Sequence, residues 1–151
     1  MRALAAAALA GLSCAAAPEL WVEALRADAA PVGGALSPGT SVVLVWAESD
    51  QAAWGRIVRA RTETPLDESK LLADVFETAS VERIEIAVGG PYPDLNEQVL
   101  LDAFQGSRRD LMPGLSVIYV SPTPPGEKLV EVFERRGSQW RHQPWRGDPP
   151  R

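Results

Sequence analysis

The sequence predicts an α/β (or α+β) domain with one small mixed sheet of about four strands, packed with two or three helices and ending in a β-hairpin. Two observations support this expectation. Four segments are rich in β-branched and aromatic residues, and most are bounded by Gly, Pro or Asp, as strands usually are. Between some of them, apolar residues recur every three or four positions, which is the pattern of a helix with one buried face.

The first two strands are expected over residues 41–48 and 81–88. The first has the sequence SVVLVWAE, a continuous apolar run that is typical of a strand buried on both faces. The second, VERIEIAV, alternates its apolar residues onto one face. Residues 114–121 and 128–135, GLSVIYVS and KLVEVFER, flank a Pro-rich loop. They predict a hairpin with a longer connection.

Two amphipathic helices are expected on either side of the second strand. The first would have Thr64 as its N-cap and Pro65 at its first position, where proline costs no hydrogen bond. The second would have Asp94 as its N-cap, with Glu97 three residues on as in a capping box, and would end at Gly106.

Residues 51–61 have two interpretations. If Ser49 or Asp50 caps them, they form a helix, although Gly55 costs about 1 kcal/mol in its interior. Alternatively, part of this segment pairs with the first strand as a second strand. The sequence does not decide between the two interpretations, so the strand order of the sheet is not determined either.

The chain divides into four regions by composition. Residues 1–17 carry one positive charge, an apolar run and then small residues, which is the pattern of a signal peptide. Residues 18–39 are expected to form a short helix and a linker or tether, because their second half is rich in Gly and Pro. Residues 40–142 are expected to be the globular domain, and residues 143–151 a disordered tail.

Cys14 is the only cysteine of the chain and a candidate lipidation site. The string from Gly11 to Cys14 resembles the lipobox of bacterial lipoproteins, although Leu12 stands one place later than that pattern usually has it. Two alternatives follow: a lipid-anchored protein, or an ordinary signal peptide cleaved near Ala16. In both cases we expect an exported protein, periplasmic or lipid-anchored to the envelope membrane. A second long apolar run is absent from the sequence, so a lipid anchor is the only membrane attachment expected.

Composition argues against several classes of function. The net charge of −5 among 151 residues does not point to a nucleic-acid partner. The only histidine, His142, lies near the expected tail, and Cys14 lies outside the domain, so neither a catalytic triad nor a zinc cluster is expected. Phosphate-binding loops, dinucleotide fingerprints and metalloprotease motifs are missing from the sequence. We therefore expect no cofactor, no metal and no catalytic residue, although enzymatic activity stays open.

Glu48, Asp50 and Asp94 are the candidates for a site at the strand ends. Ligands of α/β sheets favour the carboxyl ends of strands, and two acids at a fixed separation can act as acid and base. The alternative is structural: Asp94 caps a helix, and Glu48 faces water.

Five tryptophans suggest a binding role. We expect Trp46 and Trp54 in the core. The candidate partner-binding residues are aromatic and cationic side chains that alternate near the carboxyl end: Trp140, Arg141, Trp145 and Arg146. The alternative is that Trp140 packs inward and the tail is inert.

The expected function is that of an exported, envelope-associated accessory or binding protein without catalysis, whose partner is an envelope protein or a glycan. One alternative is a small periplasmic hydrolase-type enzyme that uses the strand-end carboxylates. The other is a carrier of an apolar small ligand, which needs a cavity between helices and sheet.

Overall fold

The computed structural model describes residues 22, 23, 25, 36, 37 and 39–146. Its centre is a sheet of four strands in the order β1-β2-β3-β4, and every neighbouring pair is parallel. The strands are β1 (Ser41–Leu44), β2 (Ile84–Gly89), β3 (Leu115–Ser121) and β4 (Gln139–Pro144). The predicted α/β class and strand number are confirmed, whereas the mixed sheet and the final hairpin are wrong.

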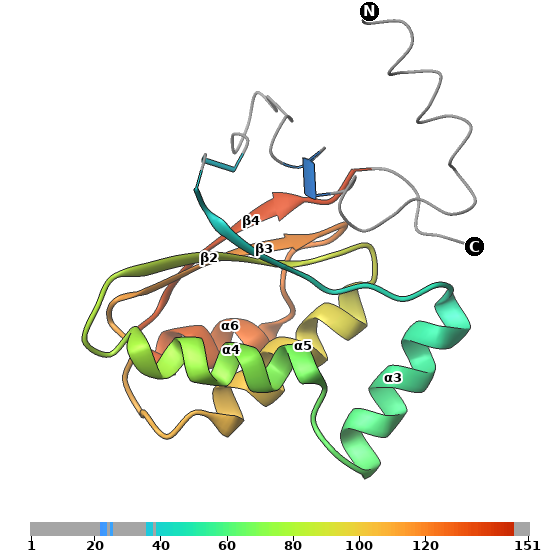
Figure 1. The fold of residues 1–151 in the computed structure, drawn as a ribbon, viewed down its shortest axis with the longest axis horizontal. Coiled ribbons are helices and arrows are strands. Elements are labelled where there is room, and N and C mark those ends of the chain that lie inside the picture. Colours follow the sequence, from blue (N-terminus) through green and yellow to red (C-terminus); the bar gives the residue numbers. More distant parts are fainter. Residues whose placement is uncertain (1–21, 24, 26–35, 38, 147–151) are drawn as a thin grey trace, which may run out of the picture.

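Four helices connect the strands and lie on one side of the sheet (Figure 1). They are α3 (Asp50–Thr62), α4 (Asp67–Thr78), α5 (Pro93–Gly106) and α6 (Glu127–Arg136). Each new strand is added beside the previous one in the same direction. Because crossovers of one hand then bring every helix to the same face, the arrangement follows from the strand order. None of the described helices is both long and apolar enough to cross a membrane.

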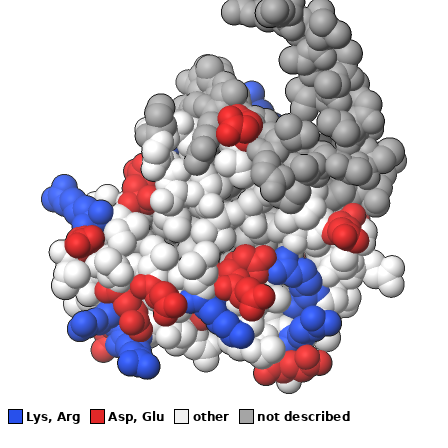
Figure 2. Space-filling model, in the orientation of Figure 1, with Lys and Arg blue, Asp and Glu red and all other residues white. Residues whose placement is uncertain are grey.

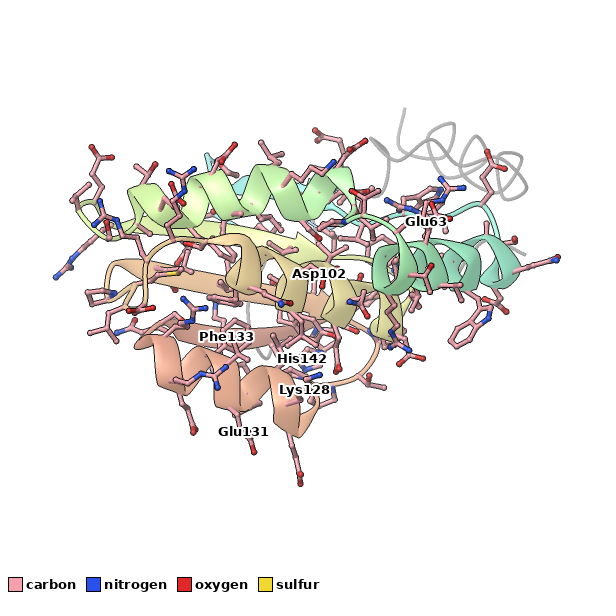
Figure 3. All side chains as sticks on the ribbon, turned by 90° about the horizontal axis from the view of Figure 1, so that it is seen from below. Glu63, Asp102, Lys128, Glu131, Phe133 and His142 are labelled. Atoms are coloured by element: carbon pink, nitrogen blue, oxygen red, sulfur yellow. The ribbon has the colours of Figure 1, made fainter. Side chains whose placement is uncertain are left out.

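The main core lies between the sheet and these helices. Phe104 of α5 contacts Phe76 of α4, with 4.7 Å between ring centroids, and Phe133 of α6, edge-on at 5.5 Å. Figure 3 shows Phe133 on the sheet side of α6 and Glu131 on its outer side. Aromatic pairs of this geometry add to the free energy gained by burial, so these rings hold three helices together.

A second apolar cluster covers the other face of the sheet. Ala87, Ile118 and Val120 point to this side and pack with Leu25, Leu36 and Trp145. A parallel sheet is normally covered on both faces. Leu25 falls in the segment predicted as a short helix and Leu36 in the segment predicted as a linker, and they are only 5% and 2% exposed. Both residues therefore pack against the sheet, and Leu25 is helical.

Residues 128–135, predicted as a strand, form most of α6. The apolar residues of this segment that are buried, Leu129, Val132 and Phe133, follow a helical spacing and not an alternating one. The helix ends at Gly137, whose φ of 69° is left-handed and suits a glycine.

The carboxyl-terminal region is more ordered than its composition predicts. We expected a disordered tail from residue 143, but β4 continues to Pro144, and Trp145 is only 5% exposed. Proline is tolerated here because β4 is an edge strand. The predicted signal peptide, including Cys14, and residues 147–151 lie outside the described residues.

The structure also decides where the helices begin. Residues 51–61 are helical, and the Ser49 hydroxyl accepts a hydrogen bond from the Ala52 N–H at 3.1 Å. In contrast, α5 begins at Pro93 with Tyr92 as N-cap, and α4 is preceded by Leu66. The caps predicted at Asp94 and Thr64 are therefore wrong by two residues.

Candidate functional site

The carboxyl ends of the strands come together at one edge of the sheet, and a close backbone contact fixes the loop after β2. The Gly90 N–H donates to the Val120 carbonyl at 3.0 Å. A Cβ added at Gly90 would lie 2.0 Å from the Val45 carbonyl oxygen. The loops after β1 and β2 are thus in contact at a position that only glycine fits.

Asn96, at the start of α5, ties the same loop to the sheet. Its side chain is fully buried, and its Nδ2 donates to the Gly90 carbonyl at 2.8 Å and to the Val120 carbonyl at 3.3 Å. Buried polar groups that are bonded in this way fix a local geometry. The first turn of α5 is therefore held in place, with Tyr92 and Asp94 on it.

A cavity of about 180 Å³ lies between the first half of α3 and the first turn of α5. We call it the α3–α5 pocket. Its lining residues come from these two elements: Asp50, Ala53, Trp54, Ile57, Tyr92, Pro93, Asp94 and Leu95. Two aromatic side chains and two carboxylates thus surround one small hollow.

The carboxylates of the α3–α5 pocket belong to the first turns of two helices. Asp50 is the first residue of α3, and Asp94 is the second of α5. Neither carboxylate has an ion pair or a hydrogen bond with another described side chain. Burial raises the pKa of Tyr92, and the negative charge of Asp50 raises it further, so Asp50 contributes a negative field at the Tyr92 hydroxyl.

Trp54 is 58% exposed, so its predicted place in the core is wrong. Two apolar pairs on α3 have the same spacing of four residues: Ala53 with Ile57, and Trp54 with Val58. The structure buries the first pair, and α3 makes its main contacts with α5. Only one stripe of α3 can face α5, which leaves Trp54 beside the pocket.

The third predicted strand-end acid is placed elsewhere. Glu48 is exposed and does not line the α3–α5 pocket. The structure therefore brings Asp50 and Asp94 to one cavity, as the position of the strand ends suggested, but leaves Glu48 apart. Sequence reasoning missed Trp54 and Tyr92 as members of this site. The sequence did contain a signal for Trp54: α3 carries two apolar stripes, and only one of them can be buried.

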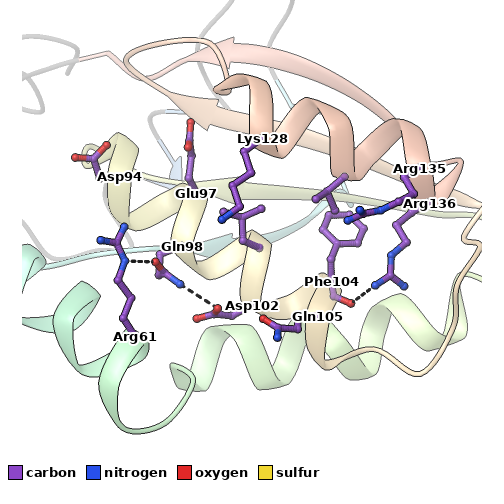
Figure 4. Close-up of a pocket in the computed structure, with 12 residues that line it drawn as sticks. Arg61, Asp94, Glu97, Gln98, Asp102, Phe104, Gln105, Lys128, Arg135 and Arg136 are labelled. Atoms are coloured by element: carbon purple, nitrogen blue, oxygen red, sulfur yellow. Dashed lines mark hydrogen bonds between the residues drawn. The ribbon is translucent and has the colours of Figure 1, made fainter.

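A second hollow, the α5–α6 groove, has a volume of about 580 Å³ and many charged walls (Figure 4). Several of its polar groups hold helices together. Arg61 of α3 donates to Gln98 at 2.8 Å, and Gln98 donates to Asp102 at 3.0 Å. Glu97 accepts the Gly126 N–H at 2.7 Å, at the start of α6.

Charges of both signs are interspersed over the helical side of the molecule in the view of Figure 2. The α5–α6 groove has this character too: Lys128 and Arg135 lie on its α6 side, and Asp102 lies on its α5 side. Such a mixed surface gives no strong preference for an anionic or a cationic partner. The groove is therefore a weaker candidate site than the α3–α5 pocket.

The four residues predicted to bind a partner do not form one surface. Trp140 stacks on Phe133 on the helical side, with ring centroids 5.8 Å apart. Arg141 pairs in register with Ile118, which belongs to the opposite face. Trp145 is buried, and its ring centroid lies 6.3 Å from that of Trp46. Arg146 is exposed and follows β4.

His142 lies in β4 beside Tyr119 of β3, at a ring distance of 6.2 Å. Its Nε2 is 2.8 Å from the Ser121 carbonyl oxygen, to which it donates. Burial raises the pKa of Tyr119 to about 12. Because His142 Nε2 faces a carbonyl and not a hydroxyl, this geometry is not that of a nucleophile with its base.

The described residues contain no cluster of three or more His, Cys, Asp or Glu side chains that could hold a metal ion. Comparison of the chain with protein-family models, with curated proteins and with solved structures gave no match. The function is therefore argued from the site itself and not from the fold.

Proposed function

We propose that this chain is an exported, envelope-associated binding protein without catalytic activity, and that the α3–α5 pocket is its binding site. The observation that carries the proposal is the exposed Trp54 beside a cavity that also holds the carboxylates of Asp50 and Asp94, neither of which is paired with a described side chain.

The fold leaves the large aromatic side chain of Trp54 mostly in water, at the mouth of the pocket. Trp54 and its neighbour Val58 on α3 are 58% and 41% exposed. Tryptophan is among the residues most enriched in interfaces and most often provides a large share of binding free energy there. An exposed tryptophan next to a hollow therefore supports a binding role.

The pocket is also held in a fixed shape. Arg56 binds Glu68 of α4 and the Trp46 carbonyl, which anchors α3. Asn96 anchors the first turn of α5. A preorganised site loses less conformational entropy when its partner binds, which supports recognition by this part of the surface.

The exported state is part of the proposal and is supported by the composition of residues 1–17. We expect the mature chain to begin at a lipid-modified Cys14 or near Ala17. The intact mass and N-terminal sequence of protein from membrane and soluble fractions distinguish these forms. A chain that retains Met1 in the cytoplasm would contradict export.

Binding is tested by photocrosslinking in the cells that make the protein. A photoreactive amino acid is placed at Val58, beside Trp54, and in a control at Leu71 of α4, which is 54% exposed. We expect a defined crosslinked species from position 58 that is lost when Trp54→Ala is added. An equal yield from position 71, or none from position 58, would contradict the proposal.

A small hydrolase-type enzyme is the second candidate, because Asp50 and Asp94 share one cavity. It predicts that Asp50→Asn and Asp94→Asn each abolish hydrolysis of a substrate panel without unfolding the protein. A hydrolytic activity that survives both substitutions would remove this candidate. No comparable observation favours carriage of an apolar ligand, because Phe76, Phe104 and Phe133 pack against one another in the core.

A further inference from the structure

We infer that the α3–α5 pocket receives one basic side chain, preferably an arginine, from a partner polypeptide. This inference rests on the proposed function, because it names the chemical group that the same pocket binds.

The size of the cavity favours a single side chain. Pockets that enclose a drug-sized molecule have volumes of about 300–1,000 Å³, whereas the α3–α5 pocket has about 180 Å³. A pocket of this size takes a group that projects from a larger partner. Val58, exposed on the same face of α3 as Trp54, extends the contact surface for the rest of that partner.

The charge of the cavity favours a cation. The ends of α3 and α5 that meet here each carry about half a positive charge from the helix dipole, whereas Asp50 and Asp94 each carry a full negative charge. The balance is negative. The nearby Arg56 does not reverse it, because both oxygens of Glu68 accept from its Nη2, at 2.6 and 2.7 Å.

The walls of the cavity favour a planar cation with N–H groups. A guanidinium stacks on the face of a tryptophan or tyrosine ring and is attracted by its quadrupole. Carboxylates accept several N–H groups of a guanidinium at once. Trp54, which is 58% exposed, provides the main ring, with the largely buried Tyr92 beside it, and Asp50 and Asp94 provide the acceptors. A quaternary ammonium would use the rings but would leave both carboxylates without a donor.

The inference is tested by NMR titration of the ¹⁵N-labelled full chain. The probes are N-acetyl-arginine amide, its neutral isostere N-acetyl-citrulline amide, choline and glucose. The Trp54 indole N–H signal, assigned with Trp54→Phe, reports on the pocket. We expect the arginine compound to shift this signal and the amides of the first turn of α5. We expect citrulline, choline and glucose to bind at least about tenfold more weakly.

Charge variants show whether the two acids decide the binding. Asp50→Asn and Asp94→Asn are each expected to weaken the arginine compound about fivefold, and added salt is expected to weaken it in the unchanged protein. Asp74→Asn is the control, because Asp74 is an exposed acid on α4, outside the pocket. It should leave the affinity unchanged, and unchanged dispersion of the spectra shows that each variant is folded.

The outcomes separate this inference from the proposed function. Equal binding of the arginine and citrulline compounds, or preferred binding of glucose or choline, would overturn the inference that the pocket receives a basic side chain. The pocket would still be a binding site. Arginine binding that is equal in the two pocket variants and in Asp74→Asn would place the cation elsewhere. If no probe shifts the Trp54 signal, the inference is wrong, and crosslinking at Val58 alone decides the proposed function.

Discussion

Arg56 of α3 and Glu68 of α4 form an ion pair in which the Arg56 Nη2 lies 2.6 Å from Glu68 Oε1 and 2.7 Å from Oε2. The Nη1 of the same guanidinium donates to the Trp46 carbonyl at 2.5 Å. The two side chains are only 28% and 22% exposed. One arginine thus joins α3, α4 and the chain that leaves β1, and it positions the helix that carries Asp50 and Trp54.

The first prediction compares two arginines of α3. Arg56→Met keeps the aliphatic stem but leaves Glu68 and the Trp46 carbonyl without their donor, so we expect a loss of about 1–3 kcal/mol in the free energy of unfolding. Arg59→Met is the control, because Arg59 lies 3.9 Å from Glu63 with both side chains mostly exposed. It should cost less than about 0.5 kcal/mol. Urea unfolding measures both, and equal losses would contradict a structural role for Arg56.

The second prediction compares two glycines. Gly90→Ala would place its Cβ 2.0 Å from the Val45 carbonyl oxygen, so the loops after β1 and β2 must separate, at a cost of about 3 kcal/mol or more. Gly55→Ala meets no atom within 4 Å and lies inside α3. It should raise the free energy of unfolding by about 0.5–1 kcal/mol. Thermal unfolding tests this opposite response, and a stable Gly90→Ala would show that the contact is not required.

The parts of the fold that sequence predicts well are those with one unambiguous pattern. Residues 114–121 are rich in β-branched and aromatic residues, and β3 occupies Leu115–Ser121. The alternation over residues 84–88 lies within β2. Gly106 ends α5 as predicted. In each case the local pattern and the tertiary position agree.

The segment 128–135 could not be assigned in this way. Its valines and phenylalanine favour a strand by composition, while the spacing of its buried residues fits a helix. Tertiary packing decides, because Phe133 needs a helical position to meet Phe104 edge-on. The predicted hairpin is wrong for this reason. The mixed sheet is wrong too, because the hairpin would have supplied its antiparallel strands.

The candidate site was predictable only in part. Asp50 and Asp94 follow strand ends, and the rule for α/β sheets brings such residues to one edge. Tyr92 and Trp54 enter the site because α3 packs on α5, a contact between residues about forty positions apart that no local pattern encodes. Glu48 also follows a strand end, so this rule alone does not exclude it from the site.

The third prediction concerns the end of the chain. Truncation after His142 removes Trp145, whose N–H donates to the Ser121 carbonyl at 2.9 Å and whose ring is only 5% exposed. We expect a loss of about 3–5 kcal/mol in the free energy of unfolding. Truncation after Arg146 removes none of the described contacts and serves as the control. If the chain that ends at His142 melts at the same temperature as the full chain, residues 143–146 are a dispensable tail.

The fourth prediction concerns two buried amides. Gln143 is 2% exposed, and neither Nε2 nor Oε1 has a hydrogen-bond partner among the described residues. Gln143→Leu removes two unpaired polar atoms and should stabilise the protein by about 1–2 kcal/mol. Asn96→Leu, in contrast, removes two hydrogen bonds from a fully buried amide. It should destabilise by about 2 kcal/mol or more, and a Gln143→Leu that destabilises equally would show that this amide is bonded.

The fifth prediction is a pH dependence that arises from Tyr119. Burial raises its pKa from 10 to about 12. Between these two values the unfolded chain has lost the phenolic proton while the folded chain still binds it. Stability that is fully present below pH 10 is therefore lost as the pH rises to about 12, by roughly 3 kcal/mol in all.

The chain has two tyrosines, so Tyr92→Phe leaves Tyr119 as its only titrating phenol. In that variant, the ultraviolet absorbance of tyrosinate should rise well above pH 10, together with the loss of folded structure by circular dichroism. Tyr119→Phe keeps the buried ring and removes the titrating hydroxyl, so its free energy of unfolding should fall less steeply over the same range. A tyrosinate midpoint near 10 in folded Tyr92→Phe would show that the Tyr119 hydroxyl is in contact with water, because burial from water is the main cause that raises its pKa.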